Sequence, residues 1–222
     1  MINIAIDGPS GAGKSTIARA VSQKLGFLYI DTGAMFRSLA YKAVKQGIDI
    51  ANEHNSLKSM LSDTTLTIER IDGVQHMILD GEDITDFIRT PEVSKAASDI
   101  AVIDFVRNWL LELERSLAKE YDCIMDGRDI GTHVLPDAKV KIFLTASAET
   151  RAKRRLKELK EKGIDISFEE VLSDMKYRDK QDSEREIAPL KMADDAHLAD
   201  TSDKSFDESV DYILDIIKRE SM

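Results

Sequence analysis

The apolar positions of the chain alternate between short continuous runs and helical spacing, which is typical of an α/β protein. Residues 2–6 are mostly β-branched and precede a glycine, which predicts a buried strand of a parallel sheet. Apolar residues then recur at helical spacing over 14–25, and Gly26 ends this predicted helix. A second strand over 27–30 and a second helix over 32–46 are expected to follow.

The last hundred residues repeat this alternation. Buried strands are predicted over 122–125 and 140–144, and a strongly basic helix over 148–162. Ser167 and Ser205 each precede a Glu three residues later, so each predicts a capping box at the start of a helix. Strands that alternate with helices predict a parallel sheet with helices on both faces.

The middle of the chain has a different pattern. Residues 66–71 and 75–79 resemble strands and flank Asp72-Gly73, which is a strong hairpin-turn signal. Antiparallel strands between βα units indicate an inserted subdomain rather than a continuation of the parallel sheet.

Residues 91–121 have a helical pattern throughout. Asp104 is a candidate N-cap for a helix that begins at Phe105, so we expect the helix to break just before it.

Composition narrows the function classes. The 222 residues carry a net charge of −10, and the 42% hydrophobic and 32% charged fractions are typical of a soluble globular protein. No apolar run approaches the roughly 20 residues of a membrane span, and no secretory signal is visible. The acidic balance argues against binding to a nucleic-acid backbone. The lone Cys123 suits a reducing compartment, so we expect a cytoplasmic protein.

The segment from Gly8 to Ser15 matches G-x-x-x-x-G-K-[ST], the P-loop that binds nucleotide phosphates. Its glycines let backbone N–H groups turn toward phosphate oxygens, and the following helix points its positive end there. Lys14 is expected to reach the β- and γ-phosphates, and the Ser15 hydroxyl to ligate Mg²⁺. The alternative is a structural glycine-rich turn, but the motif's place between strand and helix favours phosphate binding.

The P-loop alone does not select a kinase, a switch or a motor. The chain lacks the Asn-Lys-x-Asp motif of guanine-specific switches, and it lacks the length and basic tracts of nucleic-acid motors. Three further motifs are specific: DTGAMFR at 31–37, DGRDIGT at 126–132 and RDKQDSEREIAPL at 178–190. With the P-loop and the antiparallel insert over 64–85, they resemble the bacterial cytidylate kinases nearly from end to end.

This resemblance implies a P-loop nucleoside monophosphate kinase fold in one kinase domain. The core would be formed by residues 1–32, 121–148 and 188–222, the NMP-binding insert by 33–120 and the lid region by 149–187. The reaction would transfer a phosphoryl group from Mg·ATP to CMP, and to dCMP, in a monomer without nucleic-acid or membrane partners. The alternatives are a kinase for another monophosphate or metabolite, and a nucleotide-dependent regulatory protein.

The resemblance also implies roles for individual residues. The ATP site would contain Gly8, Pro9, Ser10, Gly11, Ala12, Gly13, Lys14, Ser15, Thr16, Arg151 and Arg155. The acceptor site would contain Thr32, Arg37, Ser98, Arg107, Arg128, Asp129, Arg178, Asp182 and Arg185. Catalytic roles fall to Lys14, Arg128, Arg154, Arg178 and Arg185.

The residue types suit this chemistry. Phosphoryl transfer depends on positioning and charge neutralisation, and arginine binds phosphate through a planar fork. Asp126 ends a buried strand, where α/β sheets place their ligands, and is our candidate for the second shell of Mg²⁺. The resemblance implies that the Asp129 carboxylate accepts a hydrogen bond from the cytosine amino group. With uracil it would face the O4 acceptor, with no hydrogen between the two oxygens.

Spacing alone leaves structural alternatives open. Arg178, Asp182 and Arg185 share one helical face and could be a solvated face with an ion pair. Arg128 and Asp129 could likewise form a surface salt bridge, and the basic helix that carries Arg151, Arg154 and Arg155 could be solvated rather than part of a lid. Ser98 could be a helix-surface serine and Arg107 a rim residue; the two can converge only if the helix breaks between them.

Overall fold

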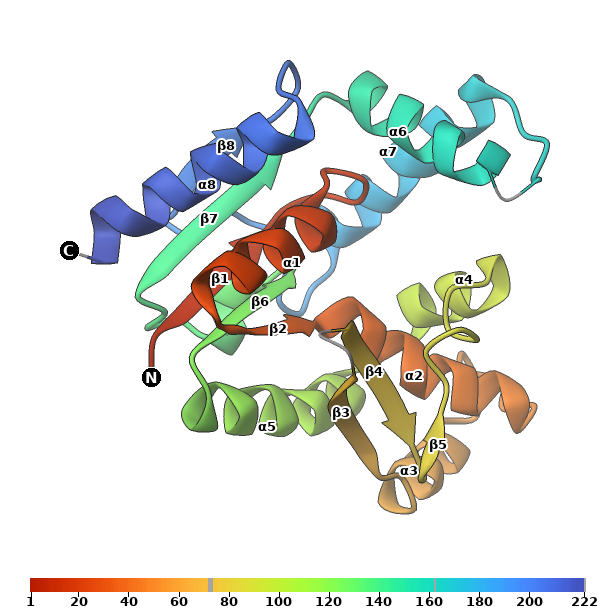
Figure 1. Ribbon diagram of the computed structural model, residues 1–222. Helices are drawn as coiled ribbons and strands as arrows, with labels where there is room; N and C mark the ends of the chain where they lie inside the picture. The colour runs from red at the N-terminus through yellow and green to blue at the C-terminus, as the bar shows by residue number, and fades with distance from the viewer. Residues whose placement is uncertain (72–73, 162, 222) are drawn as a thin grey trace. The chain divides into compact units, whose positions relative to one another are not determined.

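The chain forms two structural units in the computed structural model, which describes residues 1–71, 74–161 and 163–221. The first, here called the sheet unit, comprises Met1–Tyr29 and Tyr121–Met222. The second, here called the hairpin unit, is Ile30–Glu120. Figure 1 shows the elements of both.

A five-stranded sheet organises the sheet unit. Its strand order is β2-β6-β1-β7-β8, with β1 parallel to both β6 and β7, and β7 parallel to β8. In this register Asp7 lies opposite both Gly127 and Phe143, so the carboxyl ends of β1, β6 and β7 meet at one edge. The strands are β1 (Asn3–Asp7), β2 (Leu28–Asp31), β6 (Cys123–Gly127), β7 (Val140–Thr145) and β8 (His197–Asp200).

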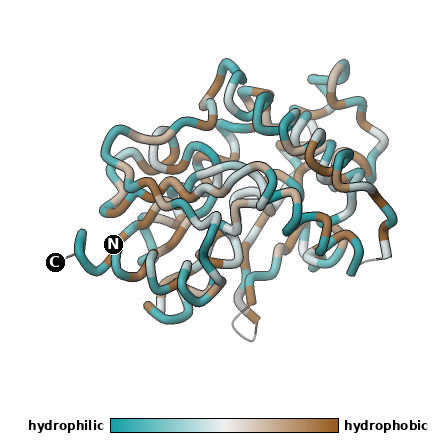
Figure 2. The backbone as a smooth tube through the Cα atoms, turned by 90° about the horizontal axis from the view of Figure 1, so that it is seen from above, coloured by the Kyte–Doolittle hydropathy of each residue, from teal (hydrophilic) through white to brown (hydrophobic). Residues whose placement is uncertain are grey.

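The core of the sheet unit lies between the strands and the helices α1 (Lys14–Leu25) and α8 (Phe206–Ser221). Ile4, Ile6 and Ile124 project toward these helices, and they are fully buried. Ala5 and Met125 project from the opposite face of the same strands and are also fully buried, so both faces are covered. Hydrophobic and hydrophilic stretches alternate over short distances along the backbone (Figure 2), as expected of elements with one buried face.

Two further helices, α6 (Ala148–Glu161) and α7 (Phe168–Glu184), lie side by side in the sheet unit (Figure 1). They pack through a small apolar cluster of their own that includes Ala152, Leu159, Val171 and Met175. The predicted capping box begins α7, because Ser167 accepts the Glu170 N–H and the Glu170 carboxylate accepts the Ser167 N–H.

The hairpin unit combines helices with a three-stranded sheet of order β3-β4-β5. Its antiparallel β3–β4 pair, with Leu66 opposite Leu79, confirms the predicted hairpin strands, while the Asp72-Gly73 turn lies outside the described residues. The elements are α2 (Thr32–Lys45), α3 (His54–Ser62), β3 (Leu66–Ile71), β4 (Val74–Leu79), β5 (Glu82–Asp83), α4 (Pro91–Ile100) and α5 (Asp104–Glu120).

The predicted break in the long helical segment is confirmed, since α4 ends at Ile100 and α5 begins at Asp104. The new helix thus starts one residue earlier than the predicted Phe105. No element was predicted from the sequence at α3, β5, β8 or the π-helical turn η1 (Ile130–Val134), each of which has nine residues or fewer. Within the described part of the chain, no helix is long and apolar enough to cross a membrane.

Truncation of a buried side chain on β6 should test this core. Ile124→Ala is expected to lower the free energy of unfolding by about 2–5 kcal/mol, because Ile124 is fully buried and its removal leaves a cavity. Leu198→Ala on β8 is the control: Leu198 is 57% exposed, and its truncation should cost about 0.5 kcal/mol or less. Urea denaturation measures both, and equal losses would contradict the assigned core.

Candidate active site

The loop between β1 and α1 has the conformation that the P-loop motif requires. Gly8, Gly11 and Gly13 have φ values of 146°, 73° and 92°, which favour glycine. Gly13 is the N-cap of α1, and no side chain caps the helix there. The N–H groups of the first turn of α1 are therefore not satisfied by a capping side chain, as suits an anion-binding site.

Lys14 is buried at the start of α1. Its Nζ donates to the Pro9 carbonyl at 2.8 Å, which bends the side chain back over the loop. Burial, and next the positive charge of Arg128, lower the pKa of Lys14 from its ordinary 10.5 to about 7, although Asp126 and Asp7 oppose the shift. An anionic ligand at this loop would favour the charged form of Lys14.

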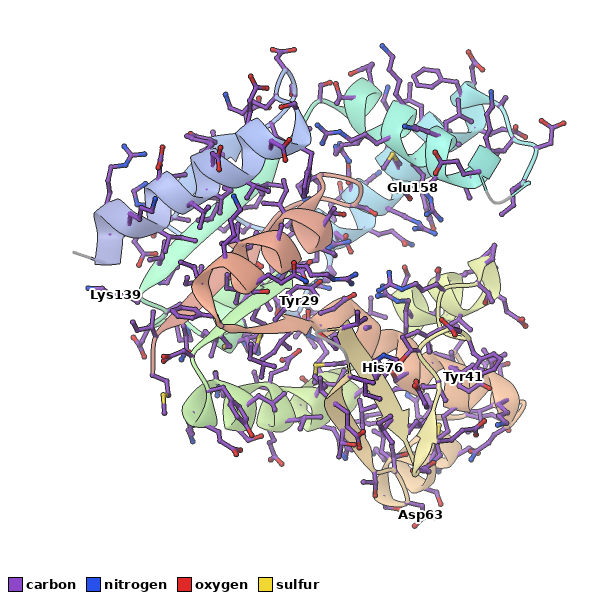
Figure 3. All side chains as sticks on the ribbon, in the orientation of Figure 1. Tyr29, Tyr41, Asp63, His76, Lys139 and Glu158 are labelled. Carbon is purple, nitrogen blue, oxygen red and sulfur yellow. The ribbon has the colours of Figure 1, made fainter. Side chains whose placement is uncertain are left out.

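A buried carboxylate orients Ser15. The Ser15 hydroxyl donates to Asp126 Oδ2 at 2.8 Å, and the hydroxyl of Tyr29 (labelled in Figure 3) donates to Asp126 Oδ1 at 2.9 Å. The Tyr29 ring lies against the Arg19 guanidinium, 5.5 Å from the ring centroid. The hydroxyl and the carboxylate form a set of hard oxygen donors, which is what Mg²⁺ prefers.

Two ion pairs join the segment after β6 to the end of α7. Arg128 Nε donates to Asp182 Oδ2 at 2.7 Å, and Arg185 Nη2 donates to Asp129 Oδ1 at 3.0 Å. The second pair is buried, with both side chains less than a tenth exposed. These four residues therefore come together in the sheet unit, where Arg128 and Asp129 each pair with a residue at the end of α7.

Arg185 is held by a strained turn as well. Its Nε donates to the Ala188 carbonyl at 2.7 Å, and Ala188 has a φ of 49°, which is unusual for a residue with a Cβ. The strained backbone at Ala188 thus presents the carbonyl that orients Arg185, a predicted site arginine.

The three arginines of α6 have different surroundings. Arg151 is buried and donates to the carbonyls of Ser10 and Ala146 and, through both Nη atoms, to Asp179 on α7. It thereby holds the P-loop beside α7, where the Gly11 backbone also approaches Met175.

Arg154 donates to the carbonyls of Ala12 and Thr201, at 3.2 and 2.9 Å, so it also lies against the P-loop. Arg155 lies farther out and pairs with Glu158 at 3.0 Å. By contrast, Arg178 makes no hydrogen bond or ion pair with any described residue and is half-buried on α7. Its guanidinium keeps all its donors for a ligand.

In the hairpin unit, Asp31 organises the start of α2. It accepts the Ala34 N–H as the N-cap, and its carboxylate pairs with Arg37 at 3.1 Å and Arg89 at 3.2 Å. Thr32, at the first position of α2, is buried.

Ser98 and Arg107 lie on different helices of the same unit. Ser98 is exposed on α4 and donates to the Ser94 carbonyl at 3.5 Å. Arg107 is buried on α5, donates to the Ala101 carbonyl and lies over the Phe36 ring. Their convergence on a base stays a prediction.

Four residues of these networks were not anticipated from the sequence: Asp7, Tyr29, Arg89 and Asp179. Asp7 carried a usable signal, because a carboxylate that ends a buried strand just before a P-loop lies at the ligand edge of the sheet. The partners of the other three are far apart in sequence, and spacing does not reveal them.

Comparison with known proteins agrees with this geometry. The cytidylate kinase family model matches residues 4–219. The cytidylate kinase of Caldicellulosiruptor bescii is 49% identical over 97% of this chain and 95% of its own length. That of Shouchella clausii is 48% identical over 99% and 97%. A crystal structure of an uncharacterized protein from Eubacterium ventriosum has the same fold, with a TM-score of 0.56 and 13% identity over 98% of this chain and 99% of that one.

The tight packing of the loop predicts that a side chain at position 8 destabilises the fold. A Cβ there would lie 1.9 Å from the Leu144 carbonyl oxygen, so Gly8→Ala should separate β1 from β7 and lower the free energy of unfolding by at least about 2 kcal/mol. Gly26→Ala is the matched control, because Gly26 also has positive φ but has no atom within 4 Å; it should cost only about 1 kcal/mol. Thermal and urea unfolding compare them, and equal losses would show that φ alone matters.

The lowered pKa of Lys14 predicts a pH dependence of stability. Between pH 7 and 10.5 the unfolded chain binds more protons at this lysine than the folded chain, so the free energy of unfolding should rise with pH. The rise attributable to Lys14 is on the order of 1 kcal/mol per pH unit. Urea denaturation of the nucleotide-free protein at pH 7.5, 8.5 and 9.5 measures it, with Lys14→Met as the reference. Parallel slopes in the two proteins would contradict the shift.

Proposed function

Because this chain belongs to the cytidylate kinase family, we propose that it transfers the γ-phosphoryl group of ATP to CMP and dCMP, giving ADP with CDP or dCDP. The observation that carries the proposal is the charge arrangement around the P-loop. Lys14 and Ser15 lie beside Asp126 and Arg128 in one unit. The groups that would bind the ATP phosphates and those that would bind the acceptor nucleotide therefore lie at one edge of the sheet.

We assign ATP to the loop from Gly8 to Thr16. The backbone N–H groups and Lys14 would hold the phosphates, and Arg154 is placed against the same loop. Arg151 already donates to Asp179 and two carbonyls, so we propose that it supports the ATP site by holding the loop at Ser10. Arg155 would reach ATP only after leaving Glu158.

Mg²⁺ would be held by the Ser15 hydroxyl, with Asp126 acting through the metal's water shell. When bound, the ion supplies positive charge that neutralises the β- and γ-phosphates. Tyr29 keeps the Asp126 carboxylate in a fixed orientation for this role. The fit rests on the oxygen chemistry of the two donors, which suits a hard cation that retains several waters.

In the transfer step, an oxygen of the CMP phosphate forms a bond to the γ-phosphorus, and the bond from that phosphorus to the β–γ bridging oxygen breaks. The attacking oxygen is already ionised, so the step needs no strong general base. Arginines and Lys14 neutralise the charge on the transferred group. We assign this role to Lys14, Arg128, Arg154, Arg178 and Arg185; among the described residues, none occupies the donors of Arg178.

For the acceptor, we propose that Arg128 holds the phosphate, Asp182 the ribose hydroxyls and Asp129 the cytosine amino group. Thr32, Arg37, Ser98, Arg107, Arg178 and Arg185 complete the set carried over from the resemblance. The lone Cys123 is buried and free, which suits a cytoplasmic enzyme; the monomeric state stays a prediction. A kinase for another monophosphate and a regulatory nucleotide binder are the alternatives that the assay below separates.

A coupled ADP-release assay with Mg·ATP against CMP, dCMP, UMP, AMP and GMP tests the proposal. Turnover should be fast with CMP and dCMP, slow with UMP and absent with purines. ATP binding without turnover on any acceptor would instead favour the regulatory alternative.

Asp129→Asn tests the base-reading role. The substitution replaces one carboxylate oxygen, an acceptor, by an NH₂ donor. The ratio of kcat/KM for CMP to that for UMP should therefore fall about tenfold, because one unsatisfied hydrogen bond costs about 1–3 kcal/mol. Asp211→Asn is the control, because Asp211 is 70% exposed and pairs with Lys24 on the surface. A loss of CMP activity with unchanged selectivity would assign Asp129 to structure through Arg185 instead.

A further inference from the structure

Asp7 is a buried carboxylate to which neither the sequence motifs nor the proposed reaction gives a role. It is the last residue of β1, directly before Gly8 of the P-loop, and only 4% of it is exposed. Burying a carboxylate costs free energy unless its oxygens are hydrogen-bonded, so its partners indicate why it is there.

Both oxygens of Asp7 accept backbone N–H groups from one segment. Oδ1 accepts from Ile130 at 2.8 Å, and Oδ2 accepts from Gly131 at 2.7 Å. These two residues directly follow Arg128 and Asp129 in the chain. Asp7 therefore connects the strand that leads into the P-loop with the segment whose side chains, Arg128 and Asp129, are proposed to bind the acceptor nucleotide.

The charge state of Asp7 supports strong hydrogen bonds. Burial raises the pKa of Asp7 to about 6. The N–H groups of Gly131 and Ile130 and the charge of Lys14 oppose this shift, and the negative charge of Asp129 adds to it. At pH 7.5 the carboxylate is still ionised, so both N–H groups donate to a negative charge. The same charge lies close enough to Lys14 to favour its protonated form.

Gly131 shows that the segment is packed closely against this carboxylate. A Cβ at Gly131 would lie 3.1 Å from Lys141 Cδ and 3.4 Å from Asp7 Oδ2. A side chain at residue 131 would therefore crowd both the stem of Lys141 and the Asp7 carboxylate.

We propose that Asp7 is a positioning residue for the acceptor nucleotide: by accepting the N–H groups of Ile130 and Gly131, it fixes the backbone that orients Arg128 and Asp129. The inference rests on the acceptor roles proposed above for those two side chains. It assigns Asp7 to the acceptor side of the reaction, although Asp7 is adjacent in sequence to the ATP-binding loop.

Asp7→Asn at pH 7.5 tests this assignment. An asparagine in the same orientation presents its oxygen to one of the two N–H groups and its own NH₂ to the other. We expect kcat/KM for CMP to fall at least tenfold, with a higher KM for CMP and a lower preference for CMP over UMP. Mg·ATP binding, measured by calorimetry, should stay within about threefold, because the bound phosphates themselves favour the charged form of Lys14.

A parallel loss of ATP and CMP affinity, or no loss of either, would overturn the assignment. Asp49→Asn is the control, because Asp49 accepts the Ala51 N–H on an exposed loop, and its replacement should leave the kinetics unchanged. Gly131→Ala is the second variant and carries the test if Asp7→Asn does not fold. It keeps the Asp7 charge but displaces the same backbone, so it should weaken CMP use while ATP binding stays unchanged.

Amide hydrogen exchange separates this inference from the proposed function. In Asp7→Asn, the N–H groups of Ile130 and Gly131 should exchange at least tenfold faster, while those of Ile124 and Met125 in β6 keep their protection. Unchanged exchange at Ile130 and Gly131 would overturn the positioning role whatever the enzyme phosphorylates. If the wild-type protein turned over no acceptor, the proposed function would fail, and the exchange result would still decide whether Asp7 fixes this segment.

Discussion

The parallel pairing of β1 with β6 is the constraint on which the candidate site depends. The pairing places Ile6 opposite Asp126 and Asp7 opposite Gly127, so both strands end at the same level. The P-loop leaves one strand where the Arg128–Asp129 segment leaves the other. Because backbone hydrogen bonds set this register, a slip of one residue would turn Asp126 away from Ser15.

Charge compensation explains how an acidic protein holds a cluster of arginines. A buried charge is tolerated when a partner of opposite charge and good geometry is present. In the sheet unit, three site arginines form ion pairs whose side chains are all less than a third exposed, whereas Arg178 has no partner among the described residues. The arrangement keeps most of the cluster rigid before a ligand arrives and leaves one guanidinium for the ligand's phosphates. The pairs are Arg128–Asp182, Arg151–Asp179 and Arg185–Asp129.

The basic helix α6 illustrates how far sequence pattern reaches. Its start, its basic character and its place before α7 follow from the sequence, and the structure has all three. The sequence does not show, however, that its arginines have different surroundings. Arg151 is buried against Asp179 and Ser10, whereas Arg155 pairs with Glu158 farther from the P-loop. Helical spacing places side chains on a face, but the element that packs against that face decides which of them can reach a ligand.

The sequence by itself determined the alternation of strands and helices, the P-loop, the break before Asp104 and the family, because these depend on local periodicity, capping and short motifs. The tertiary structure decided which carboxylate meets which cation, and which groups Asp7 and Tyr29 contact. Asp7 meets Gly131 across 124 positions, and Tyr29 meets Asp126 across 97. Such contacts arise only when strands distant in the chain pair in one register, and no local pattern encodes that geometry.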